Sequence, residues 1–193
     1  MNTPWVLGID PGFGMTGLVL RREDARDVVA WATYTLPREN APELQMLRSV
    51  SLAQAIVDCV AEWIAEYDVR VLEVCIEQPI YNHNAKILML QCRLFEDIER
   101  GLAEAIEPVL DQLWFTEVNP MRSKLLLAHD GSANKRAMIA ASPFVEAAHP
   151  QDVKEALADA FAHSLAGGTR QYDVSGMQLT IVQATAAGKG EPK

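Results

Sequence analysis

The stretch VLGIDPGFGMTG, residues 6–17, has two possible interpretations, and each predicts a different class of protein. Its G-x-G-x-x-G pattern matches a dinucleotide-binding loop, whereas Asp10-Pro11-Gly12 places an acid on a tight turn after an apolar strand. A dinucleotide loop must lead into a helix whose N-terminus binds the pyrophosphate, but residues 18–23, LVLRRE, are short and β-prone. Pro11 also removes an amide donor from the loop. We therefore expect a hairpin turn, in which Asp10 either caps the turn or presents a carboxylate to a metal ion.

The composition predicts one globular domain without a membrane segment. The chain has 193 residues, of which 49% are hydrophobic and 22% are charged, and this length supports one stable core. No apolar run approaches the roughly 20 residues that span a bilayer, and the N-terminal residues lack the pattern of a signal peptide. The cysteines Cys59, Cys75 and Cys92 lie in apolar stretches and fit core residues of a reducing compartment. We expect a cytoplasmic protein of a bacterium or of a phage-infected cell.

The charge is distributed unevenly along the chain. The net charge is −9 and the sequence pI is about 4.9, which taken alone argues against a nucleic-acid partner, because phosphate contacts need Lys and Arg. Residues 39–73 are strongly acidic. Residues 119–140 instead carry four Lys and Arg side chains against one acid, Asp130. An acidic protein can still present one basic face to DNA.

The order of elements indicates an α/β domain. Strands are expected at 5–9, 17–23, 27–37, 69–79 and 113–118, and helices at 43–67, at 84–106, from Asn119-Pro120, near Ser132 and after Pro150. The first three strands predict an antiparallel meander, and the later alternation of strand and helix predicts a parallel part of the same sheet.

Two acids come at the ends of apolar strands. Asp10 follows the first strand, and Glu77 ends the strand that contains VCIEQP, residues 74–79. Open α/β sheets bind ligands at the carboxyl ends of their strands. If these two strands are neighbours, both carboxylates project into one crevice.

The last helix adds three acids on one face. Asp152, Glu155 and Asp159 are spaced i, i+3 and i+7. Clustered carboxylates repel one another unless a cation neutralises them. Mg²⁺ prefers oxygen ligands, and two such ions about 4 Å apart catalyse phosphodiester hydrolysis.

The motifs LGIDPGFGMTG, VCIEQP and GSANK, followed by the acidic helix, resemble the RuvC-type Holliday junction resolvases of the ribonuclease H-like superfamily. The resemblance covers residues 5 to about 167 and implies a mixed sheet flanked by helices, with the nuclease domain at 1–168 and an extension at 169–193. It further implies a homodimeric endonuclease that nicks four-way or otherwise branched DNA symmetrically. Two Mg²⁺ ions per active site are implied, with Mn²⁺ as a substitute.

The resemblance also assigns roles to individual residues. Asp10 and Glu77 match the first two catalytic acids. The expected DNA-binding residues are Lys124 and Lys135, which match lysines that approach phosphates, and Arg122 and Arg136, which reinforce them. Tyr81 is expected either to stack on an unpaired base or to pack within the protein. The position of His163, one turn after Asp159, allows it to assist proton transfer, but we favour a role as a cation near the helix C-terminus.

Two pairings of the helix acids are possible. Asp152 and Glu155 keep the family's i, i+3 spacing, whereas Glu155 and Asp159 at i, i+4 resemble the mitochondrial and poxvirus branch. We favour the second pairing, because Asp152 suits the first turn of the helix, where the helix dipole stabilises an acid. The predicted catalytic and metal-binding set is therefore Asp10, Glu77, Glu155 and Asp159.

Other functions are compatible with parts of the pattern. Sugar kinases and actin-like ATPases open with a similar hairpin, but they need two such domains, so we expect no nucleotide cofactor. A protein that binds branched DNA without cutting it, or a nuclease of structured RNA, remains an alternative. For the homodimer we expect helix 84–106 to contribute to the interface, because Met89, Phe95 and Leu102 add apolar surface to its core stripe.

Overall fold

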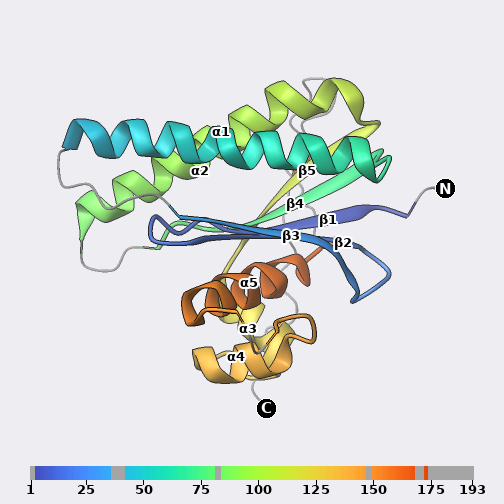
Figure 1. The fold of residues 1–193 in the computed structure, drawn as a ribbon, viewed down its shortest axis with the longest axis vertical. Coiled ribbons are helices and arrows are strands. Elements are labelled where there is room, and N and C mark those ends of the chain that lie inside the picture. Colours follow the sequence, from blue (N-terminus) through green and yellow to red (C-terminus); the bar gives the residue numbers. More distant parts are fainter. Residues whose placement is uncertain (1–2, 36–41, 81–83, 147–148, 168–171, 174–193) are drawn as a thin grey trace, which may run out of the picture.

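The fold is a mixed β-sheet with helices on both faces (Figure 1). A computed structural model describes residues 3–35, 42–80, 84–146, 149–167 and 172–173. The strands are β1 (Trp5–Asp10), β2 (Thr16–Arg22), β3 (Val28–Tyr34), β4 (Val71–Glu77), β5 (Gln112–Val118) and β6 (Tyr172–Asp173), in the sheet order β3-β2-β1-β4-β5-β6.

The register of the central strands brings the two predicted strand-end acids together. β1, β2 and β3 form an antiparallel meander, and β1, β4 and β5 pair in parallel, as the sequence predicts. Ile9 lies opposite Ile76. Asp10 and Glu77, the next residue of each strand, therefore leave the sheet at the same edge.

The sixth strand lies outside the predicted nuclease domain. β6 pairs antiparallel with β5, with Tyr172 opposite Phe115. Residues 169–193 were expected to be an extension, and two of these residues lengthen the sheet. The domain boundary at residue 168 stays a prediction.

Two layers of helices cover the sheet (Figure 1). One face carries α1 (Pro42–Glu66) and α2 (Ala85–Ile106). A short 3-10 turn, η1 (Glu107–Val109), follows α2. The other face carries α3 (Pro120–Ala128), α4 (Lys135–Ala141) and α5 (Gln151–Ser164).

The first layer is held by apolar side chains at helical spacing. Leu52, Ile56 and Val60 of α1 are buried, as are Ile98 and Leu102 of α2. They join the apolar side chains of β1, β2, β4 and β5 in the largest core cluster. The amphipathic patterns that predicted these helices thus reflect burial against the sheet.

Asparagine caps set where α3 and α4 begin. The Asn119 side chain accepts a hydrogen bond from the Met121 amide at 2.9 Å, with proline at the first helical position, as predicted. Asn134 accepts from the Ala137 amide at 3.0 Å. α4 therefore begins at Lys135, three residues later than the position near Ser132 that the sequence suggested. Ser132 instead belongs to the preceding turn.

Two glycines let α5 lie directly on the strands. A Cβ atom at Gly8 would be 2.0 Å from the Ala160 carbonyl oxygen, and one at Gly17 would be 2.2 Å from that of Ala156. Gly17, the last glycine of the opening motif, thus permits close packing of helix on sheet. Because of this contact, the middle of α5 lies next to the end of β1.

Gly8→Ala should therefore lower the free energy of unfolding by roughly 3 kcal/mol, because the contact is with backbone atoms that cannot rotate away. Urea denaturation measures the change. Gly14→Ala is the matched control, since a Cβ atom there meets nothing within 4 Å. Equal unfolding midpoints for the two variants would contradict the packing argument.

The cysteines lie in or near the core, as the sequence predicts. Cys59 and Cys75 are buried, Cys92 is half-buried, and all three are free thiols. Within the described ranges, no helix combines the length and apolar character needed to cross a membrane.

Candidate active site

A cavity of about 200 Å³ opens at the edge of the sheet where β1 and β4 end. Side chains from β1, β4, α3, α4 and α5 meet there. The lining residues are Asp10, Glu77, Pro120, Ser123, Lys124, Lys135, Met138, Asp159, Ala162 and His163.

Asp10 and Glu77 also border a second cavity. This space of about 180 Å³ is closed by the turn after β1, by the residues after β4 and by Gln91 of α2. The acidic pair therefore forms the wall between two adjoining cavities. A substrate that passed along this edge would meet both carboxylates.

The two strand-end carboxyls differ in acidity. Burial raises the pKa of Asp10 well above its ordinary value, and the charges of Asp159 and Glu77 raise it further. Burial also acts to raise the pKa of Glu77, but His163, Asp10 and Lys135 together outweigh it and lower that pKa. The pair thus favours one shared proton over two negative charges. A cation can take the place of that proton.

Asp159 is the acid of α5 that reaches this cavity. Its carboxylate forms an ion pair with the Lys135 ammonium group, which comes from the first turn of α4. Burial acts to lower the pKa of Lys135, but the hydrogen bond to Asp159 and the charges of Asp159, Asp10 and Glu155 raise it. Lys135 therefore holds a stable positive charge among the acids, in addition to any role toward phosphate.

The other two acids of α5 are placed differently. Glu155 is not among the residues that line the cavity, and its carboxylate accepts a hydrogen bond from the side-chain Nε2 of Gln151 at 2.9 Å. Asp152 is exposed in the first turn, where its carboxylate accepts from the Val153 amide at 3.0 Å. The structure thus brings Asp159 to Asp10 and Glu77. That these acids bind metal and catalyse stays a prediction.

The predicted DNA-binding residues separate into groups. Lys124 and Lys135 line the cavity. Arg122 and Arg136 are exposed and are not among the lining residues, although each is close in sequence to one of these lysines. Tyr81 lies outside the described residues.

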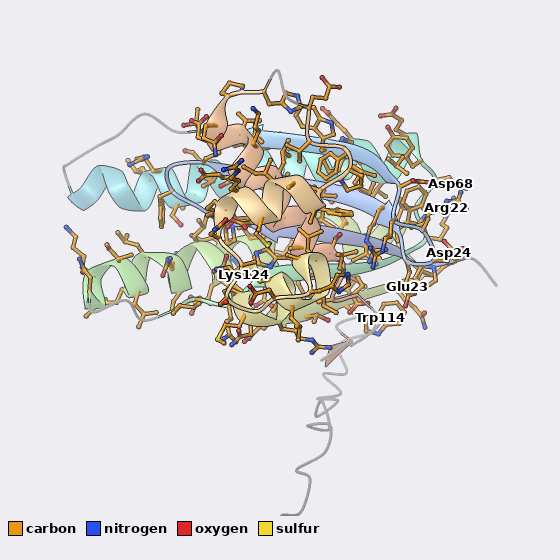
Figure 2. The ribbon with its side chains drawn as sticks, turned by 90° about the horizontal axis from the view of Figure 1, so that it is seen from below. Arg22, Glu23, Asp24, Asp68, Trp114 and Lys124 are labelled. Atoms are coloured by element: carbon orange, nitrogen blue, oxygen red, sulfur yellow. The ribbon has the colours of Figure 1, made fainter. Side chains whose placement is uncertain are left out.

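Three acids lie at the end of the sheet opposite the cavity. Figure 2 shows Lys124 well apart from Glu23, Asp24 and Asp68, which gather where β1 begins. A DNA backbone that approached Lys124 would thus avoid these acids.

His163 has a more central position than the sequence suggested. It is only 2% exposed and lines the cavity. Its Nδ1 lies 2.7 Å from Ser123 Oγ, and its Nε2 lies 3.3 Å from Glu77 Oε2. The helical spacing gave one signal, because His163 is four residues after Asp159 and therefore on the same face.

A mixed sheet of this order, with acids from β1, β4 and the last helix gathered at one edge, defines a nuclease domain of the ribonuclease H-like superfamily. The sequence model of the family described as crossover junction endodeoxyribonuclease RuvC matches residues 6–163. The chain belongs to this family, which confirms the predicted family and fold.

Solved structures show the same fold. Thermus thermophilus RuvC is 18% identical, with a TM-score of 0.57 over 83% of this chain and 93% of that one. T. thermophilus RuvC in complex with a Holliday junction substrate is 17% identical, with a TM-score of 0.54 over 86% of this chain and 97% of that one. No curated protein sequence matches the chain.

Proposed function

We propose that the protein resolves four-way or otherwise branched DNA junctions by metal-dependent hydrolysis of phosphodiester bonds, with symmetric nicks in opposing strands. The observation that carries this proposal is the convergence of Asp10, Glu77 and Asp159 on one cavity in a member of the RuvC family. A protein that only held DNA would gain nothing from three acids that repel its phosphates.

The donor set fits divalent cations. Asp10 and Glu77 stand so close that the pKa of Asp10 is raised while that of Glu77 is lowered, so the pair favours a single negative charge unless a cation lies beside it. Asp10, Glu77 and Asp159 would hold the ions, with Glu155 as the fourth ligand that the i, i+4 spacing supplies. When bound, two Mg²⁺ ions, or Mn²⁺ in their place, would activate a water molecule and stabilise the leaving oxygen of the phosphodiester.

The remaining cavity residues act on the substrate and on the acids. Lys124 offers a positive charge at the rim, where it can bind a phosphate next to the scissile bond. Lys135 neutralises Asp159 and keeps its carboxylate directed into the cavity. Pro120 and Met138 are apolar parts of the lining.

A direct test incubates the purified protein with a synthetic four-way DNA junction and Mg²⁺, with Mn²⁺ in parallel. Paired nicks at symmetric positions are expected. A linear duplex and a four-way RNA junction of the same sequence serve as comparison substrates, and faster cutting of the RNA would favour the alternative nuclease. Binding without cleavage of any branched substrate in either ion would overturn the proposal in favour of a binding protein.

Lys124→Ala should weaken junction binding and lower the slope of log affinity against log salt by about one counterion, because one phosphate contact is lost. Fluorescence anisotropy at several salt concentrations measures both. Arg70→Ala is the matched control, since Arg70 pairs with Asp68 at 2.8 Å at the opposite end of the sheet. A slope unchanged by Lys124→Ala would place the DNA elsewhere.

We further propose that the protein is a homodimer, although the structure corrects which side chains are available. Phe95 and Leu102, expected at the interface, are 7% and 0% exposed and belong to the core of the single chain. Met89 is 71% exposed and Ile87 is 49% exposed. The N-terminal halves of α1 and α2 project beyond the strands (Figure 1), and these two side chains belong to that part of α2.

Light scattering should therefore give twice the mass of the chain, and Met89→Asp should shift the population toward the monomer, because a charge would be buried at a two-fold interface. Met121→Asp is the control, since Met121 is 67% exposed on α3. A wild-type mass of one chain, with and without junction DNA, would contradict the dimer.

A further inference from the structure

We propose that His163 supplies an imidazole ligand to the divalent ion held by Asp10 and Glu77, and that this mixed set of ligands favours Mn²⁺ over Mg²⁺. The proposal rests on the proposed metal-dependent function and adds a ligand outside the predicted acidic set. It follows from the position of one buried nitrogen atom.

The Nε2 atom of His163 is buried without a hydrogen-bonding partner among the described residues. It approaches Glu77 Oε2 to 3.3 Å, but without the alignment of a hydrogen bond. Buried polar atoms in folded proteins nearly always have a partner. This nitrogen faces the cavity, so an atom or ion that interacts with it would bind in the cavity.

The three ligand atoms are close enough to share one ion. One oxygen from each of Asp10 and Glu77 and one ring nitrogen of His163 all lie within 4.8 Å of one another. Ligand atoms about 2.1 Å from a common ion are at most about 4.2 Å apart. A small side-chain rotation therefore suffices to close the set around an ion.

The other ring nitrogen is held in the manner typical of a metal-binding histidine. Nδ1 lies 2.7 Å from the hydroxyl of Ser123, which is 1% exposed and in turn donates to the Asn119 carbonyl oxygen at 3.5 Å. If Nδ1 carries the proton and donates it to Ser123, the Nε2 lone pair is left to face the acids. Such a second hydrogen bond fixes the tautomer and orientation of histidine ligands.

The ligand chemistry predicts the choice of ion. Mg²⁺ binds oxygen and retains its water, whereas first-row transition ions accept imidazole nitrogen. A set of two carboxylates and one imidazole should thus bind Mn²⁺ roughly tenfold more tightly than Mg²⁺. Removal of the imidazole should erase most of that difference and leave Mg²⁺ affinity nearly unchanged.

The experiment uses the full chain without DNA. Calorimetric titrations with Mn²⁺ and with Mg²⁺ measure the preference, and electron spin-echo envelope spectra of the Mn²⁺-loaded protein detect a bound nitrogen. His163→Asn should lose the nitrogen signal and about tenfold in Mn²⁺ affinity. His129→Asn should lose neither, since His129 is exposed at the end of α3 in a left-handed conformation that asparagine also adopts.

Wild-type protein labelled with ¹⁵N-histidine gives the same answer without a substitution, because the nitrogen frequencies shift if a histidine is bound. Mn²⁺ binding to the wild type without histidine coupling would overturn the proposal and leave the metal-dependent function standing. That result would indicate the other tautomer, in which Nε2–H donates to Glu77. Failure of the wild type to bind either ion would instead overturn the proposed function itself.

Discussion

Asp10→Asn is expected to abolish junction cleavage and to leave junction binding unchanged or tighter. Asparagine keeps the shape of the side chain at the end of β1 but removes the charge that a divalent ion needs. A bound metal ion supplies several kcal/mol of transition-state stabilisation. A loss of about 4 kcal/mol corresponds to a roughly thousandfold slower reaction. The same change removes a negative charge that repels the phosphates of the substrate.

Gel assays of cleavage and of binding in EDTA separate these two effects. Asp24→Asn is the matched control, because Asp24 lies at the far end of the molecule (Figure 2). Cutting by Asp10→Asn at close to the wild-type rate would mean that Asp10 only shapes the turn.

Asp10→Asn should also stabilise the metal-free protein at neutral pH. The pKa of Asp10 is raised in the folded protein, chiefly by burial. Its ionisation therefore lowers the stability of the fold as the pH rises through that pKa. The amide carries no such charge, so the variant should melt at a higher temperature in EDTA. Equal melting temperatures would indicate that Asp10 is not under electrostatic strain.

Asp159→Asn should be as damaging as Asp10→Asn, whereas Asp152→Asn should keep most of its activity. Asp159 lines the cavity and pairs with Lys135, while Asp152 is exposed and interacts with its own helix. Asp152 is roughly 10 Å from Asp159 along the helix axis. The two therefore cannot readily bind ions about 4 Å apart.

Glu155→Gln is expected to be severely impaired. Glu155 is about 6 Å from Asp159 along the axis, and Asp159 leans toward it. Single-turnover cleavage of a labelled junction ranks the variants. Inactive Asp152→Asn together with normal cutting by Asp159→Asn would establish the alternative pairing of Asp152 with Glu155.

The strand-end acids were predictable because their positions follow from local patterns. Asp10 comes directly after an apolar strand and before a proline turn, and Glu77 ends another apolar strand. Parallel pairing of adjacent strands then places both at one edge of the sheet. The same reasoning predicted the meander and the amphipathic helices.

The features that sequence reasoning missed depend on contacts between distant segments. His163 is buried because α5 lies flat on the sheet and α3 covers its other side with Ser123. Phe95 and Leu102 are buried because α2 packs on both α1 and the sheet. Lys135 reaches Asp159 only because α4 contacts α5. None of these contacts has a local signature in the sequence.

Because α5 packs so closely on β1 and β2, substitutions on two of its faces should have different effects. The face at Ala156, Ala160 and Ser164 touches Gly8 or Gly17, so larger residues there would lift the helix from the sheet. One position earlier in each turn, at residues 155, 159 and 163, a second stripe runs along the helix with the same four-residue spacing. This stripe is separate from the contact with the two glycines, so a change of side chain on it leaves the contact of α5 with β1 and β2 in place. The framework of the fold can therefore stay constant while the side chains on this stripe change.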